Sequence, residues 1–387
     1  MACLLVLAAC GQSMPGPTPT AGPESSPTAQ MSTGGQSTPT SGAQGGASPT
    51  NTPVQVGNPG ARLLINGAGA TFPAPIYTKW FAEYTKIDPN VRFNYQPIGS
   101  GAGIQQITAR TVDFGASDAP LTDQQLQEAG ASGGELLHIP TVAGAVAVIY
   151  NLPNVPTGLK LDGETLADIY LGKITEWDDP AIKSQNAEAA SNLKGDIVVV
   201  HRSDGSGTTN IFTDYLSAVS GEWKGAVGKG TSVKRPVGLG ARGNAGVAGQ
   251  VQQTPGAIGY VELAYALQNK LTYASIKNGS GEFIQPTIDS TTLAAEGVSV
   301  PDDLRVSIVN SSKSGSYPIA GFTYILVYRN QPDAEKGAAL AKFLWWATHD
   351  GQSMAKELDY APLSPELVRK VEAKIKSLAC GDSACYK

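Results

Sequence analysis

The sequence has little of what nucleic-acid-binding, metal-binding and membrane-spanning proteins use. Charged residues make up only 16% of the 387 residues and the net charge is −5, so no basic stripe is available for a nucleic acid. The three histidines, His138, His201 and His349, are scattered along the chain, which gives no metal-ligating cluster. After Cys10, no apolar run approaches the roughly 20 residues that span a bilayer. We therefore expect a soluble mature domain without a metal ion or another cofactor.

Cysteine is also scarce, and its four copies lie at the two ends of the chain. Cys3 and Cys10 are close to the N-terminus, and Cys380 and Cys385 are close to the C-terminus. Two cysteines five residues apart favour a small disulfide loop in an oxidising compartment. Two thiols without a nearby histidine make a poor zinc site.

The N-terminal segment has an apolar run that ends in the quartet Leu-Ala-Ala-Cys at residues 7–10. This quartet resembles the lipobox of bacterial lipoproteins, in which the peptide before the cysteine is removed and the cysteine is lipidated. The resemblance implies a signal peptide at residues 1–9 and an exported protein that Cys10 anchors to the membrane, in the periplasm or on the outer face. The alternative is an ordinary signal peptide with an accidental cysteine.

A segment rich in Pro, Thr, Ser and Gly follows the quartet. Between residues 11 and 60 the only charged residue is Glu24, and no apolar periodicity is present. Such a composition buries too little apolar surface to offset the entropy of ordering. We expect residues 10–60 to be a lipid anchor followed by a disordered tether.

The remaining chain alternates strand patterns, glycine-rich turns and helix patterns. Residues 63–66 read as a strand, and a helix pattern with one apolar face begins after Pro73. The β-branched run at residues 197–200 is typical of a strand that is buried on both faces. This alternation predicts an α/β fold with mostly parallel sheets.

Three turns of small residues precede predicted helices, at residues 71–72, 100–101 and 206–208. A helix N-terminus presents unpaired N–H groups, and Ser and Thr hydroxyls add donors, so such turns can bind an anion. Arg202 adds a positive charge with a fork that matches a tetrahedral oxyanion. Each turn on its own favours a plain helix cap, whereas three such turns together with Arg202 favour an anion site.

Longer sequence blocks give the family resemblance. The most specific ones are GAGATFPAP at residues 67–75, VDFGASDAP at 112–120 and DGSGT at 204–208. DIYLGKI at 168–174, PGAIGYVE at 255–262 and LDYA at 358–361 add to them. Together these blocks resemble the periplasmic phosphate-binding protein of the high-affinity phosphate ABC transporter.

The resemblance implies a type II periplasmic-binding-protein fold, with two α/β lobes, two hinge crossings and a ligand cleft between the lobes. It places residues 61–151 and 318–378 in lobe I, residues 152–317 in lobe II and residues 379–387 in a C-terminal tail. It further implies a monomer without catalytic residues that binds inorganic phosphate and delivers it to the permease subunits of the transporter.

The ligand contacts of the family fall on eight positions of this sequence: Thr71, Phe72, Ser100, Asp118, Arg202, Ser206, Gly207 and Thr208. The resemblance makes Arg202 the cation and gives the Ser, Thr, Phe and Gly positions the role of donors. Asp118 can only accept a hydrogen bond when ionised, so it demands a protonated ligand oxygen. Asp204 would orient Arg202 without touching the ligand.

Four alternatives or weaker motifs remain. The chain could bind another tetrahedral oxyanion, such as sulfate or molybdate. It could be a secreted phosphohydrolase with Ser206 as nucleophile, although the sequence gives no reason for His201 to lie beside Ser206. It could also be an adhesive surface lipoprotein. Residues 238–243 satisfy the G-x-G-x-x-G pattern, but no strong strand pattern precedes them, so a dinucleotide site is a weak hypothesis.

Overall fold

The computed structural model describes residues 53–386. The predicted signal peptide, Cys10 and most of the predicted tether lie outside the described residues. The predicted C-terminal limit of the tether at residue 60 is wrong, because β1 (Val54–Val56) forms an edge strand that pairs antiparallel with β3 (Val91–Gln96). Alternate valines give this short segment apolar surface to bury, which the preceding residues lack.

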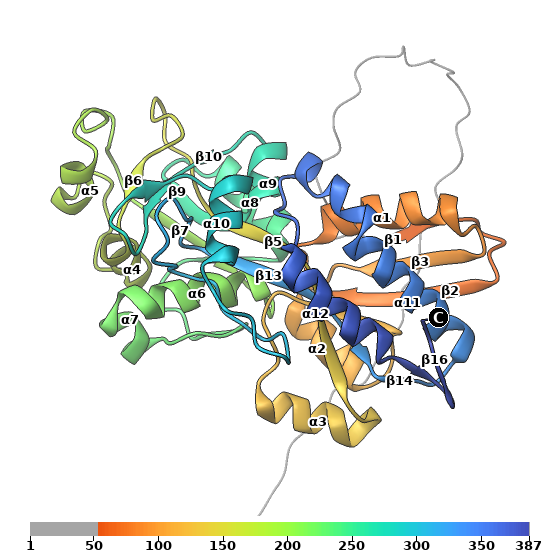
Figure 1. The fold of residues 1–387 in the computed structure, drawn as a ribbon. Coiled ribbons are helices and arrows are strands. Elements are labelled where there is room, and N and C mark those ends of the chain that lie inside the picture. Colours follow the sequence, from red (N-terminus) through yellow and green to blue (C-terminus); the bar gives the residue numbers. More distant parts are fainter. Residues whose placement is uncertain (1–52, 387) are drawn as a thin grey trace, which may run out of the picture. The chain divides into compact units, whose positions relative to one another are not determined.

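Lobe I is built on a mixed sheet in which the strand order is β1, β3, β2, β4, β13 and β5 (Figure 1). β2 is parallel with β3 and β4, whereas β13 is antiparallel to β4 and β5. The strands are β2 (Leu63–Gly69), β4 (Phe114–Ser117), β5 (Leu136–Tyr150) and β13 (Ala320–Tyr328). The helices are α1 (Ala74–Ile87), α2 (Ser100–Thr108), α3 (Asp123–Gly133), α11 (Ala334–Thr348) and α12 (Pro365–Lys376), with 3₁₀ turns η1 (Asp350–Met354) and η2 (Lys356–Leu358).

Lobe II continues the same sheet through β5, in the order β5, β9, β7 and β8. β9 is antiparallel to β5, and β7 is parallel with β8 and β9. The strands are β7 (Val198–Arg202), β8 (Leu239–Ala241), β9 (Ala257–Glu262) and β10 (Thr272–Tyr273), which pairs with β5. The helices are α4 (Gly163–Leu171), α5 (Pro180–Gln185), α6 (Gly207–Val219), α7 (Gly221–Ala226), α8 (Gly243–Gln253), α9 (Leu263–Gln268) and α10 (Ile288–Glu296). A small sheet contains β6 (Lys160–Leu161), β11 (Ser275–Lys277) and β12 (Phe283–Ile284).

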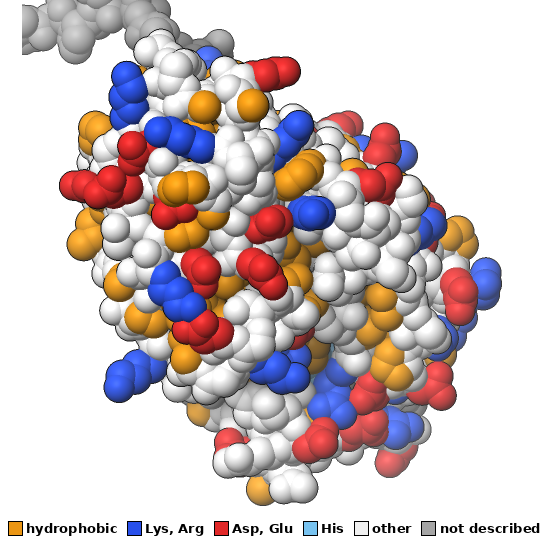
Figure 2. All heavy atoms as spheres, turned by 90° about the vertical axis from the view of Figure 1, so that its left-hand side faces the viewer, with side chains coloured by type: hydrophobic (Ala, Val, Ile, Leu, Met, Phe, Trp, Pro, Cys, Tyr) orange, Lys and Arg blue, Asp and Glu red, His pale blue; other side chains and the backbone are white. Residues whose placement is uncertain are grey.

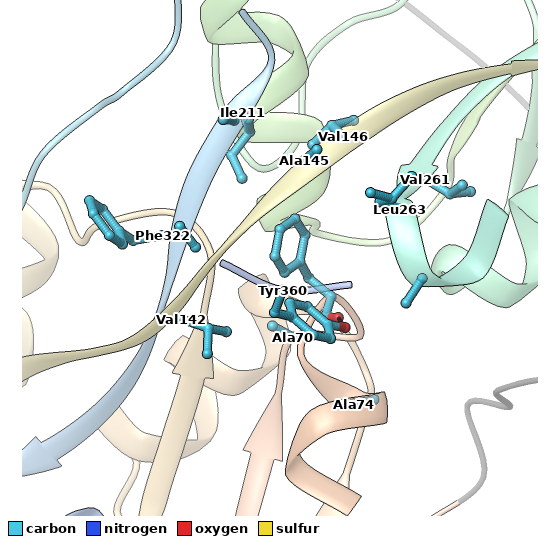
Figure 3. Packing of buried hydrophobic residues seen from close by; sticks show 14 of the residues in the cluster. Ala70, Ala74, Val142, Ala145, Val146, Ile211, Val261, Leu263, Phe322 and Tyr360 are labelled. Carbon is cyan, nitrogen blue, oxygen red and sulfur yellow. Dashed lines mark hydrogen bonds between the residues drawn. The ribbon is translucent and has the colours of Figure 1, made fainter. Parts of the chain in front are cut away.

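Strand β5 joins the two lobes. All of its 15 residues are buried, and it pairs with β13 up to Ala145 and with β9 from Val146 onward. Figure 3 shows the side chains of Val142, Ala145 and Val146 along β5, next to the β13 residue Phe322. The change of partner lies a few residues before the predicted lobe boundary at 151. The strand itself continues unbroken from one half of the sheet into the other.

The packing of α1 shows how lobe I holds its sheet. Residues with helical spacing, among them Tyr77, Phe81 and Tyr84, form the buried face of the helix. Phe81 stacks on Phe93 of β3 with ring centroids 4.4 Å apart. This aromatic face fixes α1, and with it the turn between β2 and α1, against the sheet.

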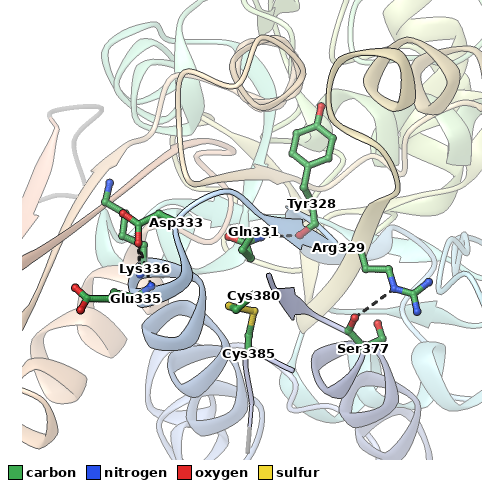
Figure 4. The surroundings of a disulfide bond; sticks show 9 residues. All are labelled: Tyr328, Arg329, Gln331, Asp333, Glu335, Lys336, Ser377, Cys380 and Cys385. Carbon is green, nitrogen blue, oxygen red and sulfur yellow. Dashed lines mark hydrogen bonds between the residues drawn. A yellow bond between two sulfur atoms is a disulfide. The ribbon is translucent and has the colours of Figure 1, made fainter. Parts of the chain in front are cut away.

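The C-terminal segment forms a third small sheet of β14 (Asn330–Gln331), β15 (Ala379–Cys380) and β16 (Ser383–Ala384). The structure contains the disulfide between Cys380 and Cys385, which closes the turn between β15 and β16 (Figure 4). Because β15 pairs with β14, the disulfide loop lies against the end of the lobe I strand β13.

Two features of the described residues bear on the sequence expectations. No helix within residues 53–386 is long and apolar enough to cross a membrane. On the face that Figure 2 shows, acidic and basic side chains are interspersed.

Candidate functional site

The eight predicted site residues lie on four strand-to-helix connections, and the structure brings them to the junction of the two lobes. Lobe I contributes the turn after β2, the N-terminus of α2 and the end of β4. Lobe II contributes the end of β7 and the N-terminus of α6. The seven that have a polar or aromatic side chain are at most 3% exposed: Thr71, Phe72, Ser100, Asp118, Arg202, Ser206 and Thr208. Gly207 is buried as well.

Hydrogen bonds between the N-terminal turns of α2 and α6 connect the lobes directly. The Gly207 N–H donates to Ser100 Oγ at 3.0 Å, and the Gly101 N–H donates to the Gly205 carbonyl at 2.9 Å. A Cβ atom on Gly207 would lie 2.5 Å from Asp118 Oδ2 and 2.6 Å from Ser100 Oγ. This approach of two helix N-termini therefore requires glycine at position 207, and it gathers N–H donors where a small anion would be held.

Asp118 is buried, and none of the basic side chains within residues 53–386 forms an ion pair with it. Thr323 Oγ1 of β13 donates to its Oδ1 at 2.8 Å, and Ser100 Oγ lies 3.4 Å from its Oδ2. Burial raises the pKa of Asp118 to about 7, although the Thr323 hydrogen bond, the Arg202 charge and the Ser100 hydrogen bond act in the opposite direction. Asp118 can therefore exchange a proton near neutral pH.

Arg202, which is buried, and Asp204, which is partly buried, form a bidentate pair. Arg202 Nε lies 2.8 Å from Asp204 Oδ1, and NH2 lies 2.6 Å from Oδ2. The Gly243 N–H also donates to Asp204 Oδ1 at 3.0 Å. Burial acts to raise the pKa of Asp204, but the hydrogen bonds and charge of Arg202, together with the Gly243 N–H, outweigh it and lower that pKa. NH1 of Arg202 lies 3.4 Å from Thr208 Oγ1, beside the predicted donors.

Three tyrosines hold the turn that carries Thr71 and Phe72. The Tyr95 hydroxyl donates to the Ala70 carbonyl at 2.6 Å and the Tyr265 hydroxyl to the Thr71 carbonyl at 2.5 Å. The Tyr360 hydroxyl donates to the Phe72 carbonyl at 2.6 Å. Tyr265 belongs to lobe II, so this turn is fixed by both lobes.

Sequence reasoning missed two residues of the site, Asn244 and Thr323. Asn244 is the second residue of α8 and contacts the Thr71 and Thr208 hydroxyls. It directly follows the glycine-rich segment 238–243, so that pattern marked a site loop and not a dinucleotide motif. Thr323 is a lone polar residue in the apolar strand β13, a signal that points to a buried hydrogen-bond partner.

The phosphohydrolase hypothesis gains no support from the geometry. His201 Nδ1 lies 3.1 Å from the Arg202 carbonyl, and burial lowers the pKa of His201. Ser206 Oγ accepts the Thr209 N–H at 3.1 Å and thereby caps α6. Within residues 53–386, no group of three or more His, Cys, Asp or Glu side chains is arranged to hold a metal ion.

Two α/β lobes that meet at buried N–H and hydroxyl donors define a periplasmic-binding-protein architecture of type II with a candidate anion site at the junction. Residues 24–350 match the family described as the PBP superfamily domain. The chain belongs to the family of phosphate-binding proteins named PstS, which are substrate-binding proteins and not enzymes.

Two relatives and one solved structure illustrate the similarity. The chain is 46% identical to the phosphate-binding protein PstS of Xylella fastidiosa (strain Temecula1), over 80% of this chain and 84% of the relative. It is also 46% identical to PstS of Pasteurella multocida, over 81% of this chain and 90% of the relative. The crystal structure of a phosphate-binding protein from Stenotrophomonas maltophilia is 21% identical, covers 80% of this chain and 93% of its own, and has a TM-score of 0.63. That structure supports the fold.

Proposed function

We propose that the protein binds inorganic phosphate at the lobe junction and presents it to the permease subunits of an ABC transporter. The observation that carries the proposal is the convergence of the eight predicted ligand residues, which are separated by up to 137 positions between Thr71 and Thr208, in one buried site. The relatives named phosphate-binding proteins give the ligand its identity.

The chemistry of the site suits a partly protonated anion. The N–H groups of the α2 and α6 N-termini, the Ser and Thr hydroxyls and Arg202 NH1 are donors for ligand oxygens. Above about pH 7, where Asp118 is ionised, it is the acceptor for a protonated oxygen, which phosphate still carries there and sulfate lacks. Sulfate would meet an unpaired carboxylate, so selectivity comes from a penalty on the wrong ligand.

Calorimetric titration of the protein with phosphate, sulfate and arsenate tests the proposal. We expect saturable binding of phosphate that sulfate does not displace. Equal competition by sulfate would favour a general oxyanion binder. Release of free phosphate from an aryl phosphate at a useful rate would favour the phosphohydrolase instead.

We also propose that the protein acts outside the cytoplasm as a monomer tethered through a lipid on Cys10. The Leu-Ala-Ala-Cys quartet supports this anchor. Changing Cys10→Ser should release the protein from the membrane fraction while phosphate affinity stays unchanged, as fractionation and titration would measure. If the variant stays in the membrane fraction, another element anchors the protein.

A further inference from the structure

Asn244 lies at the N-terminus of α8 and is fully buried between the two lobes. Its side chain contacts one hydroxyl from each lobe. Nδ2 lies 2.9 Å from Thr71 Oγ1 of lobe I and 3.2 Å from Thr208 Oγ1 of lobe II. Both threonines are among the predicted donors to the anion, so Asn244 is placed to act on the ligand through them.

The amide of Asn244 has a defined orientation. Its Oδ1 accepts the backbone N–H of Glu262 at 3.2 Å, and an N–H group can only donate. A flipped amide would place its NH₂ group against this N–H and would lose the bond. The NH₂ group therefore faces the two threonine hydroxyls, and the last residue of β9 keeps it there.

This orientation decides what the two hydroxyls can do. Thr71 Oγ1 accepts from Asn244 Nδ2 and also from the Asn244 backbone N–H at 3.3 Å. Thr208 Oγ1 accepts from Asn244 Nδ2 and from Arg202 NH1 at 3.4 Å. A hydroxyl has two acceptor lone pairs and one hydrogen. When both lone pairs face donors, the hydrogen is the part that remains for a ligand.

We infer that Asn244 is a positioning residue that makes the Thr71 and Thr208 hydroxyls hydrogen-bond donors toward the bound anion. The inference rests on the proposed phosphate site. It adds one reason why that site prefers ligand oxygens that accept hydrogen bonds. Asn244 does this without adding charge. A carboxylate of the same shape would accept from both hydroxyls and turn their hydrogens away from the ligand.

The experiment compares Asn244→Ala and Asn244→Asp with the unchanged protein by phosphate titration. Asn244→Ala should weaken phosphate binding roughly fivefold to twentyfold, because the hydroxyls lose their fixed direction but can still rotate toward the ligand. The isosteric Asn244→Asp should weaken it by roughly a hundredfold or more, since two donors are reversed and a negative charge is added. Asn186→Ala is the matched control. Asn186 is also a buried asparagine, but it bonds the Lys160 and Ile182 carbonyls in lobe II, so the affinity should not change.

Thr208→Val separates orientation from simple charge or packing effects. If Asn244 acts through the Thr208 hydroxyl, the loss caused by either Asn244 variant should be smaller in the Thr208→Val background than in the unchanged protein. Equal losses in both backgrounds, or unchanged affinity of Asn244→Asp, would overturn the inference while leaving phosphate binding intact. Absence of phosphate binding by the unchanged protein would instead overturn the proposed function.

Discussion

The loop after β4 and the loop after β7 each bury one carboxylate at the same junction, and the two carboxylates behave in opposite ways. Asp204, at the β7 loop, is paired with Arg202 through two hydrogen bonds, and its pKa is lowered. Asp118, at the β4 loop, has hydroxyl partners but no ion pair among the described residues, and burial raises its pKa to about 7. The same side chain thus serves as a fixed charge in one loop and as a proton-sensitive acceptor in the other.

This difference shows how the charge of the site is distributed. Since Asp204 already balances the charge of Arg202, the pair brings no net positive charge to an anion. Backbone N–H groups at the ends of α2 and α6 and oriented hydroxyls then have to stabilise most of the negative charge of the ligand. In the proposed site, the carboxylate of Asp118 adds selectivity between anions but weakens the attraction of the site for any anion.

Removing the fixed charge should have the largest effect. Asp204→Asn leaves Arg202 buried without a charged partner, and breaking a buried ion pair costs about 3–5 kcal/mol of the free energy of unfolding. Added phosphate should restore part of this loss, because the anion supplies a new partner. Urea unfolding with and without phosphate measures both effects. The control is Asp123→Asn at the exposed ion pair with Arg305, which should cost less than about 1 kcal/mol. Equal losses for the two variants would contradict the comparison.

Changing the cation should have a smaller effect, mainly on binding. Arg202→Lys keeps the charge but loses the fork that bonds Asp204 and faces Thr208. One missing charge-assisted hydrogen bond to a buried anion costs about 1.5–3 kcal/mol, so phosphate affinity should fall about 10- to 150-fold. Titration of the folded variant measures it, with Arg329→Lys at an exposed ion pair as control. An unchanged affinity would place Arg202 outside the ligand site.

Neutralising the proton-sensitive carboxylate should alter selectivity. In Asp118→Asn the side chain keeps its shape, loses its charge and gains a hydrogen-bond donor. The ratio of phosphate affinity to sulfate affinity should therefore fall roughly tenfold or more, chiefly because sulfate binds better. Competition titrations at one pH and salt concentration measure the ratio. Asp162→Asn, at the N-cap of α4, is the control, since both residue types cap helices well. If the ratio of Asp118→Asn equals that of the control, selectivity lies elsewhere.

The local parts of this site could be predicted from sequence, because they depend on neighbours in the chain. The run at residues 197–200 became β7, which extends two residues further to Arg202, and the small-residue turns became the N-termini of α2 and α6. A strand that ends in polar and glycine residues places them at the edge of the sheet, so pattern alone located these loops.

The remaining parts depend on contacts between distant segments. Asn244 and Thr323 reach the site through the packing of α8 and β13, and neither position has a local pattern that names its partner. The change of partner within β5 has no local pattern either, since Ala145 and Val146 belong to one continuous buried strand and differ in which strand lies beside them. The roles of the eight residues as phosphate ligands are predictions, which phosphate titration of the corresponding variants tests.

The last and smallest effect concerns pH. The pKa of Asp118 is about 7 in the folded protein and near 3.9 in an unfolded chain, so the folded state binds this proton more tightly. The stability it contributes is fully present below about pH 4 and is lost as the pH rises toward 7. Between pH 5.5 and 6.5 the unchanged protein should therefore lose up to about 1.4 kcal/mol relative to Asp118→Asn, as urea unfolding in phosphate-free buffer would measure. Glu262 is present in both proteins, and its pKa is raised chiefly by burial and only to a smaller extent by the charge of Asp118, so the main part of its contribution cancels. The difference in free energy of unfolding between the unchanged protein and Asp204→Asn should not change with pH in this range, because Asp204 is ionised in the folded and the unfolded state above pH 5. Parallel stability curves for the unchanged protein and Asp118→Asn would show that the two loops hold their carboxylates in the same way.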